Sequence, residues 1–155
     1  MILDWINRNY GISLSEAEVT PIMEFTLLWN VFENRIFSTD FTIVKLEDWI
    51  NNNHLDLNPI HDNYLYFQSR YINPDDGIRR FNVLFPNNRN EKETIYSILI
   101  SNNSSEKEKL YALGVIAYRL RNNLFHGNKT IEELPWQVVN FTQINQVLMF
   151  FLEQE

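Results

Sequence analysis

The chain has 155 residues, of which 13 are lysine or arginine and 20 are aspartate or glutamate, giving a formal net charge of −7. This length predicts a single domain over residues 1–155 with a core large enough to need no covalent staples. The chain contains no cysteine, which excludes disulfides and thiolate metal sites. The negative charge argues against an extended electrostatic interface with nucleic acid, because counterion release needs clustered lysine and arginine. It permits a small basic site.

The apolar pattern gives no sign of membrane targeting. No window approaches about 18 consecutive apolar residues, and the first residues lack the charged and apolar regions of a signal peptide. We therefore expect a soluble cytoplasmic protein with no membrane partner.

The composition and the apolar periodicity both predict helices. Glycine (4) and proline (5) are scarce, and aromatic residues make up 14% of the chain, which suits a helical protein with large core side chains. Thr20 and Pro21 are typical of an N-cap and a first helical residue, and apolar residues then recur at spacings of three and four through residue 37. The other helices are predicted over 44–52, from Asn58-Pro59 to the turn cluster 73–77, for one or two turns within 78–90, over 91–100, over 105–127 and over 140–152.

The helix predicted over 105–127 has the clearest boundaries. Ser105 and Glu108 form a capping box, in which each side chain satisfies a free backbone amide of the first turn. Gly127 follows the last apolar residues and can adopt the left-handed conformation that ends helices. Because this helix is apolar nearly all round, we expect it to be covered by the core and by a second subunit or another helix.

Several chemistry-bearing residues have ordinary interpretations. His54 and His61 lie near turns without a second ligand at metal spacing, which favours solvent-exposed or helix-end roles. Arg79 and Arg80 are expected to form a solvated pair, with a phosphate contact as the alternative. The tryptophans are expected to be packing anchors rather than stacking platforms; they are Trp5, Trp29, Trp49 and Trp136.

Polar residues inside and at the end of this apolar helix are the exception. Such groups are costly in an apolar setting unless they are paired or used. On an ideal helix Tyr118, Asn122 and His126 share one face, and Arg121 lies at the edge of the apolar stripe. Arg121 and His126 are about 140° apart. They converge on one ligand only if the helix unwinds near Gly127 or if copies from two subunits meet.

The string Arg121-Asn122-Asn123-Leu124-Phe125-His126 resembles the RxxxxH signature of the HEPN superfamily. These are small all-α domains, frequently homodimeric, and many act as metal-independent ribonucleases in toxin–antitoxin, abortive-infection and CRISPR-associated systems. The longer string to Lys129 is similar to members of the phage-defence and plasmid-borne type. About ten residues carry the specific identity, and the architecture extends the resemblance to most of the chain. It implies an all-α, HEPN-like helical bundle with short extra helices.

The resemblance implies that Arg121 and His126 are the catalytic pair and that Asn122 is the supporting polar residue. A histidine can exchange the proton of a ribose 2′-OH or of the leaving 5′-oxygen. An arginine can hold the phosphate in a bidentate fork and stabilise charge in the transition state. Attack by the 2′-OH needs no metal and leaves a 2′,3′-cyclic phosphate or its 3′-phosphate hydrolysis product.

Residues around the motif have weaker assignments. Tyr118, Arg119 and Lys129 flank it and are candidates for contacts with RNA phosphates or bases, with ordinary surface roles as the alternative. Glu33 is either an exposed helix-end residue or a partner of Arg121. Asn128 occupies the position of a tyrosine that is nucleotidylated in some HEPN toxins, so control by that route is not expected.

The sequence thus predicts a metal-independent endoribonuclease of HEPN type, without a cofactor or a metal, serving phage defence, a toxin–antitoxin pair or a stress response. The expected partners are an RNA substrate, a second copy of the chain, and an antitoxin or regulatory protein. The alternative is a catalytically silent HEPN module for dimerisation or for RNA or nucleotide binding within a larger defence complex. The net charge of −7 favours that alternative, because a general ribonuclease would be more basic. A third interpretation is an unrelated helical protein in which Arg121 and His126 have only structural roles, capping the helix end and pairing with neighbouring groups.

Overall fold

The computed structural model describes residues 1–87, 89–127 and 130–155, and every regular element in this part of the chain is a helix. The prediction of an all-α bundle is confirmed. The α-helices are α1 (Ile2–Tyr10), α2 (Glu16–Phe37), α3 (Ile43–Asn52), α4 (His61–Ile72), α5 (Gly77–Leu84), α6 (Arg89–Ile100), α7 (Glu106–Phe125) and α8 (Val138–Glu153). Two 3₁₀ helices, η1 (Asn58–Ile60) and η2 (Ile131–Gln137), precede α4 and α8.

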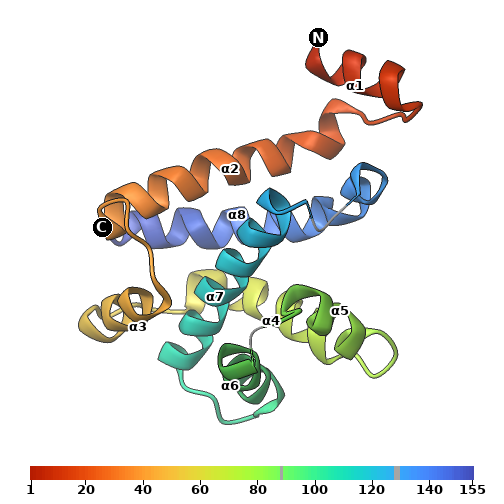
Figure 1. The fold of residues 1–155 in the computed structure, drawn as a ribbon. Coiled ribbons are helices and arrows are strands. Elements are labelled where there is room, and N and C mark those ends of the chain that lie inside the picture. Colours follow the sequence, from red (N-terminus) through yellow and green to blue (C-terminus); the bar gives the residue numbers. More distant parts are fainter. Residues whose placement is uncertain (88, 128–129) are drawn as a thin grey trace.

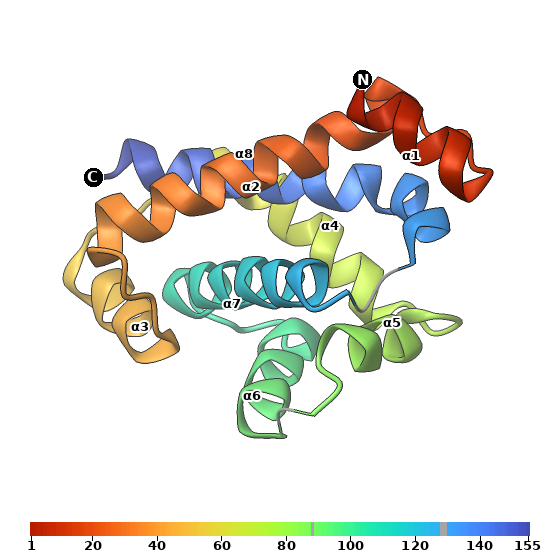
Figure 2. The same ribbon diagram turned by 45° about the horizontal axis from the view of Figure 1, so that its top comes forward.

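Helices α2 and α8 lie side by side and run in the same direction along one side of the molecule (Figures 1 and 2). Aromatic rings join them along their length. Phe25 contacts Phe141 with ring centroids 5.0 Å apart, and further along Phe32 contacts Phe151 at 5.8 Å. At the C-terminal ends Arg35 and Glu155 form an exposed ion pair of 2.8 Å.

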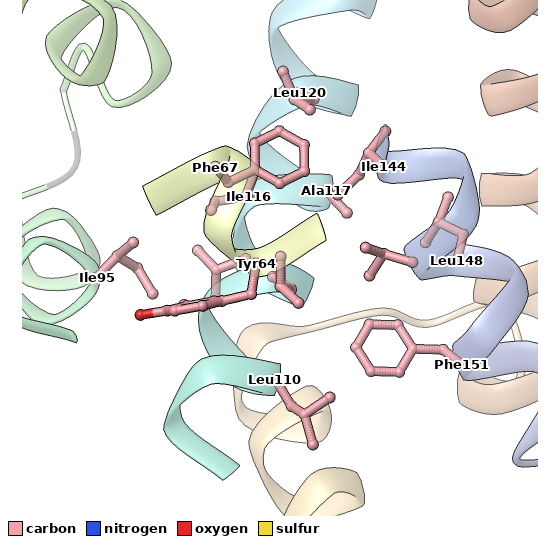
Figure 3. Close-up of a cluster of buried hydrophobic side chains, with 14 of the residues drawn as sticks. Tyr64, Phe67, Ile95, Leu110, Ile116, Ala117, Leu120, Ile144, Leu148 and Phe151 are labelled. Atoms are coloured by element: carbon pink, nitrogen blue, oxygen red, sulfur yellow. The ribbon is translucent and has the colours of Figure 1, made fainter. Parts of the chain in front are cut away.

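Helix α7 lies beneath this pair and contacts α3, α4, α5, α6 and α8 (Figure 2). Its middle section from Ala112 to Ala117 is buried on every side. Figure 3 shows Ile116, Ala117 and Leu120 of α7 between residues of α4 and α8. Other helices of the same chain therefore cover the apolar surface of α7 on all sides. This was one of the two coverings expected from the sequence, and a second subunit is not needed to explain the apolar surface.

The predicted start of α2 at Thr20-Pro21 is wrong, because the helix begins at Glu16. Ser15 is its N-cap: its hydroxyl accepts from the Glu18 amide, and its own amide donates 2.7 Å to the Glu18 carboxylate. Pro21 lies inside the helix, where it lacks the N–H that would bond one turn back. A capping box satisfies two free amides, whereas a threonine before a proline satisfies one. The start at Glu16 is therefore more stable than a start at Pro21.

Two helical elements were not predicted from the sequence, and the packing role predicted for two of the tryptophans is wrong. Helix α1 and the 3₁₀ helix η2 were both missed; α1 buries none of its residues, and η2 contains Pro135. Trp29 is 4% exposed, as expected of a packing anchor, but Trp5 and Trp136 are 52% and 76% exposed. The packing prediction is therefore wrong for those two. His54 is exposed and His61 opens α4, as expected.

None of the described helices combines the length and the apolar character needed to cross a bilayer.

Gly77 lets α4 and α5 approach closely. A Cβ at this position would stand 2.7 Å from the backbone oxygen of Tyr71 and 2.9 Å from the backbone carbon of Ile72. Backbone atoms cannot turn aside, so Gly77→Ala is expected to destabilise the fold by about 1–3 kcal/mol. Asn82→Ala is the matched control, since Asn82 is an exposed residue of the same helix and its loss should change stability by less than about 0.5 kcal/mol. Urea unfolding followed by circular dichroism measures both, and equal stabilities would refute the close approach.

Candidate functional site

The candidate motif stands where α7 leaves the core. Leu120 is 7% exposed and Phe125 is 55% exposed, so the last turn carries the helix from the interior to the surface. The helix ends as predicted: the His126 amide donates 2.9 Å to the Asn122 carbonyl, and Gly127 has φ +64°. The capping box of Ser105 at the other end is also confirmed.

Arg121 is partly buried and is held by neutral groups. Its Nη1 donates 3.0 Å to the Oδ1 of Asn122, and its Cζ lies 5.2 Å from the centroid of the Phe125 ring. Its Nε is buried without a hydrogen-bond partner. Within the described ranges no carboxylate lies at ion-pair distance from this guanidinium. The charge of Arg121 is therefore positioned but not neutralised.

Glu33 does not partner Arg121. Its carboxylate accepts a hydrogen bond of 2.8 Å from the indole nitrogen of Trp29, one turn earlier on α2. The alternative given for it from the sequence, an exposed helix-end residue, is not observed either, because Glu33 is partly buried and its carboxylate is held by Trp29.

His126 is the exposed C-cap of α7. The helix is continuous from Arg121 to Phe125, and His126 has φ −87° and ψ 6°. The helix thus does not unwind before His126, and the two catalytic candidates leave it in directions about 140° apart. Of the two conditions for their convergence on one ligand, unwinding between Arg121 and Phe125 is not observed.

Two flanking residues have roles within the fold. The ring of Tyr118 packs against Phe41 and Trp29, with centroid distances of 5.0 and 6.1 Å. Arg119 donates 3.0 Å from its Nε to the carbonyl of Leu84 at the end of α5. Both residues were candidates for RNA contacts, and the structure gives each of them a packing role. Lys129 and Asn128 lie outside the described residues.

Asn123 was not singled out from the sequence. It is 4% exposed, and its amide nitrogen lies 3.3 Å from the Val83 carbonyl and 3.4 Å from the Leu84 carbonyl. Together with Arg119 it satisfies the free carbonyl groups at the end of α5. The signal was its position three residues after Leu120, on the buried stripe, where a polar side chain needs a partner.

A second polar site, a cavity of about 340 Å³, lies beside α7. Leu120, Asn123 and Leu124 contribute its α7 wall, and neither Arg121 nor His126 lines it. Three arginines line it, namely Arg70, Arg79 and Arg80. We call it the arginine cavity. The sequence offered Arg79 and Arg80 as a solvated pair or a phosphate contact, and it gave no sign that Arg70 would join them.

The fold and the site define an all-helical bundle whose central helix ends at the surface in an Arg-Asn-Asn-Leu-Phe-His motif. Over the described part of the chain, histidines and carboxylates form no group of three that could hold a metal ion. No family model matches the chain, and no curated protein or solved structure gives a significant match to it.

Proposed function

We propose that this protein is a metal-independent endoribonuclease of HEPN type, in which Arg121 and His126 act on RNA at a cleft between two copies of the chain. The observation that carries the proposal is the state of Arg121. A partly buried guanidinium held by an amide and an aromatic ring, with no carboxylate at ion-pair distance in the part of the chain that the structure describes, is suited to receive a phosphate.

The chemistry needs one proton carrier and one charge stabiliser. His126 is exposed, so its ring is accessible to a bound ribose. The 2′-oxygen forms a bond to phosphorus while the bond from phosphorus to the 5′-oxygen breaks. His126 accepts the 2′-hydroxyl proton and then gives a proton to the leaving 5′-oxygen. Arg121 stabilises the negative charge that develops on the phosphate oxygens. Asn122 supports it by holding its Nη1.

The geometry of α7 supports the homodimer in this proposal. Since Arg121 and His126 diverge within one chain, a homodimer is proposed to supply the guanidinium from one copy and the imidazole from the other. Phe125 is 55% exposed between them and offers an apolar contact for the second copy. A biological role in phage defence, a toxin–antitoxin pair or a stress response, with an antitoxin or regulatory protein as a further partner, belongs to the same proposal.

His126→Ala is expected to lower the rate of RNA cleavage by about 10²–10⁴-fold, because removing a general acid–base group has effects of that size. The matched control is His54→Ala, which removes an exposed histidine far along the chain and should leave the rate unchanged. Purified protein is incubated with a labelled oligoribonucleotide in the presence of a chelator. The expected products carry a 2′,3′-cyclic phosphate, and an oligonucleotide with a 2′-deoxy sugar at the cleavage position should stay intact.

The outcomes separate the two candidate functions. Cleavage that the chelator abolishes would contradict the metal-free mechanism. If wild-type protein and His126→Ala both fail to cleave, the catalytically silent module for dimerisation or for RNA or nucleotide binding becomes the better proposal. The net charge of −7 is the observation in its favour.

A further inference from the structure

The arginine cavity has the charge of an anion site in an otherwise acidic protein. Its lining holds three arginines against one carboxylate, that of Glu133, and this carboxylate already accepts 3.0 Å from the backbone amide of Thr130. Asp76 lies 3.3 Å from Arg79 and 3.9 Å from Arg80, but it is half exposed and does not line the cavity. Asp76 offsets part of the charge of Arg79 and Arg80, and an anion bound in the cavity would further lower the repulsion among the three arginines.

One donor in the lining is buried without an acceptor within the described residues. This donor is the Nε of Arg70. Gln137 is 7% exposed, and its Oε1 accepts 2.8 Å from Asn140. An unpaired buried donor is costly, and an oxygen atom of a ligand would satisfy the Arg70 Nε.

The groups around Arg70 do not neutralise it. Its Cζ lies 5.9 Å from the centroid of the Tyr71 ring. Burial raises the pKa of Tyr71 to about 12, and the nearby Arg70 guanidinium offsets only part of that rise. The Tyr71 hydroxyl is therefore uncharged at neutral pH. Tyr66 donates 2.6 Å to Asn140, and burial raises the pKa of Tyr66, a rise that the Arg70 guanidinium beside its hydroxyl offsets in part, so Tyr66 too is a neutral neighbour of Arg70.

The remaining wall is apolar and aromatic. This part of the cavity is lined by Leu124, Leu134 and Phe141. Trp136 also lines the cavity, and it is 76% exposed. Such a wall suits a planar aromatic group, which can stack on the indole, better than a sugar ring in the same place, whose hydroxyls would find no partners on the apolar side chains. A volume of about 340 Å³ is at the small end of ligand sites, which run from roughly 300 to 1,000 Å³, and so fits one nucleotide better than two.

We propose that the arginine cavity binds a nucleoside monophosphate, with Arg70, Arg79 and Arg80 on the phosphate and Trp136 on the base. This site is separate from Arg121 and His126, and the proposal does not rest on the ribonuclease activity. Binding is accordingly expected to be the same in His126→Ala as in the wild type.

The test is isothermal titration of the full chain with AMP, GMP, CMP and UMP, with adenosine, inorganic phosphate and glucose 6-phosphate for comparison. At least one nucleoside monophosphate should bind saturably, and each comparison compound should bind at least about tenfold more weakly, because each lacks one half of the recognition. AMP bound at the site should also quench tryptophan fluorescence, and this quenching should be lost in Trp136→Phe.

Arg80→Gln is expected to weaken nucleotide binding by about tenfold or more, as the loss of a charge-assisted hydrogen bond does. Arg8→Gln is the matched control, since it removes the same charge from α1, a helix that buries none of its residues. If Arg80→Gln fails to fold by circular dichroism, Arg79→Gln gives the same test, because the Arg79 side chain is 70% exposed.

Four results would overturn the proposal. One is no saturable binding of any nucleoside monophosphate at millimolar concentration. Another is binding that Arg80→Gln and Arg79→Gln leave unchanged, or binding of glucose 6-phosphate as strong as that of AMP. The last is binding of a 5′-phosphorylated oligoribonucleotide in the absence of nucleotide binding, which would assign the cavity to an RNA end.

Discussion

Phe32→Ala is expected to destabilise the fold by about 3–5 kcal/mol, the usual cost of deleting a fully buried phenylalanine. Phe32 belongs to α2, and its completely buried side chain packs against Phe151 of α8. It contacts four other rings at centroid distances of 5.3 to 6.1 Å; these are Trp29, Phe37, Phe41 and Phe151. A loss of this size is a large share of the roughly 5–15 kcal/mol that holds a domain together.

Leu27→Ala is the matched control, because Leu27 is on the same helix and is 70% exposed. Its removal should change the free energy of unfolding by less than about 0.5 kcal/mol. Urea unfolding followed by circular dichroism compares the two variants. If they unfolded at the same urea concentration, the aromatic contacts between α2 and α8 would not be a main source of stability.

The boundaries of α7 could be predicted because local groups set them. Ser105 and Glu108 satisfy amides within one turn, and Gly127 takes the left-handed conformation after the last turn. The start of α2 was wrong because two local signals competed. The box of Ser15 and Glu18 outweighed the proline at position 21.

Periodicity alone could not show what covers a helix. The apolar faces of α7 were equally compatible with a second subunit, and only the tertiary structure shows five other helices of the chain against it. The same limit applies to Tyr118, which shares a helical face with His126 in an ideal projection but packs against Phe41. Helical register gives directions, and it does not say which neighbour fills them.

The two candidate sites also differ in how far the sequence could predict them. The motif from Arg121 to His126 is contiguous in sequence, so its residues could be named at once. The arginine cavity is assembled from α4, α5, α7, η2 and α8, and no local pattern links Arg70 to Gln137. Its charge became visible only when the fold brought these elements together.

Mixing Arg121→Ala chains with His126→Ala chains is expected to restore RNA cleavage that neither variant has alone. In a two-fold dimer whose sites take the guanidinium from one copy and the imidazole from the other, a mixed dimer contains one site with both groups and one with neither. Random pairing makes half of the dimers mixed, each with one complete site out of two, so about a quarter of the wild-type activity should return.

The experiment uses the two variants produced together with different affinity tags, and each variant alone is the control that should stay at background. The geometry of α7 is the reason to expect complementation: the helix is continuous from Arg121 to Phe125, and positions five apart on a regular helix are about 140° apart around its axis. If both groups acted from the same chain, every site in the mixture would lack one of them and no activity would return. Light scattering gives an independent check, because a monomer of the wild-type chain at the assay concentration would contradict a site shared between copies.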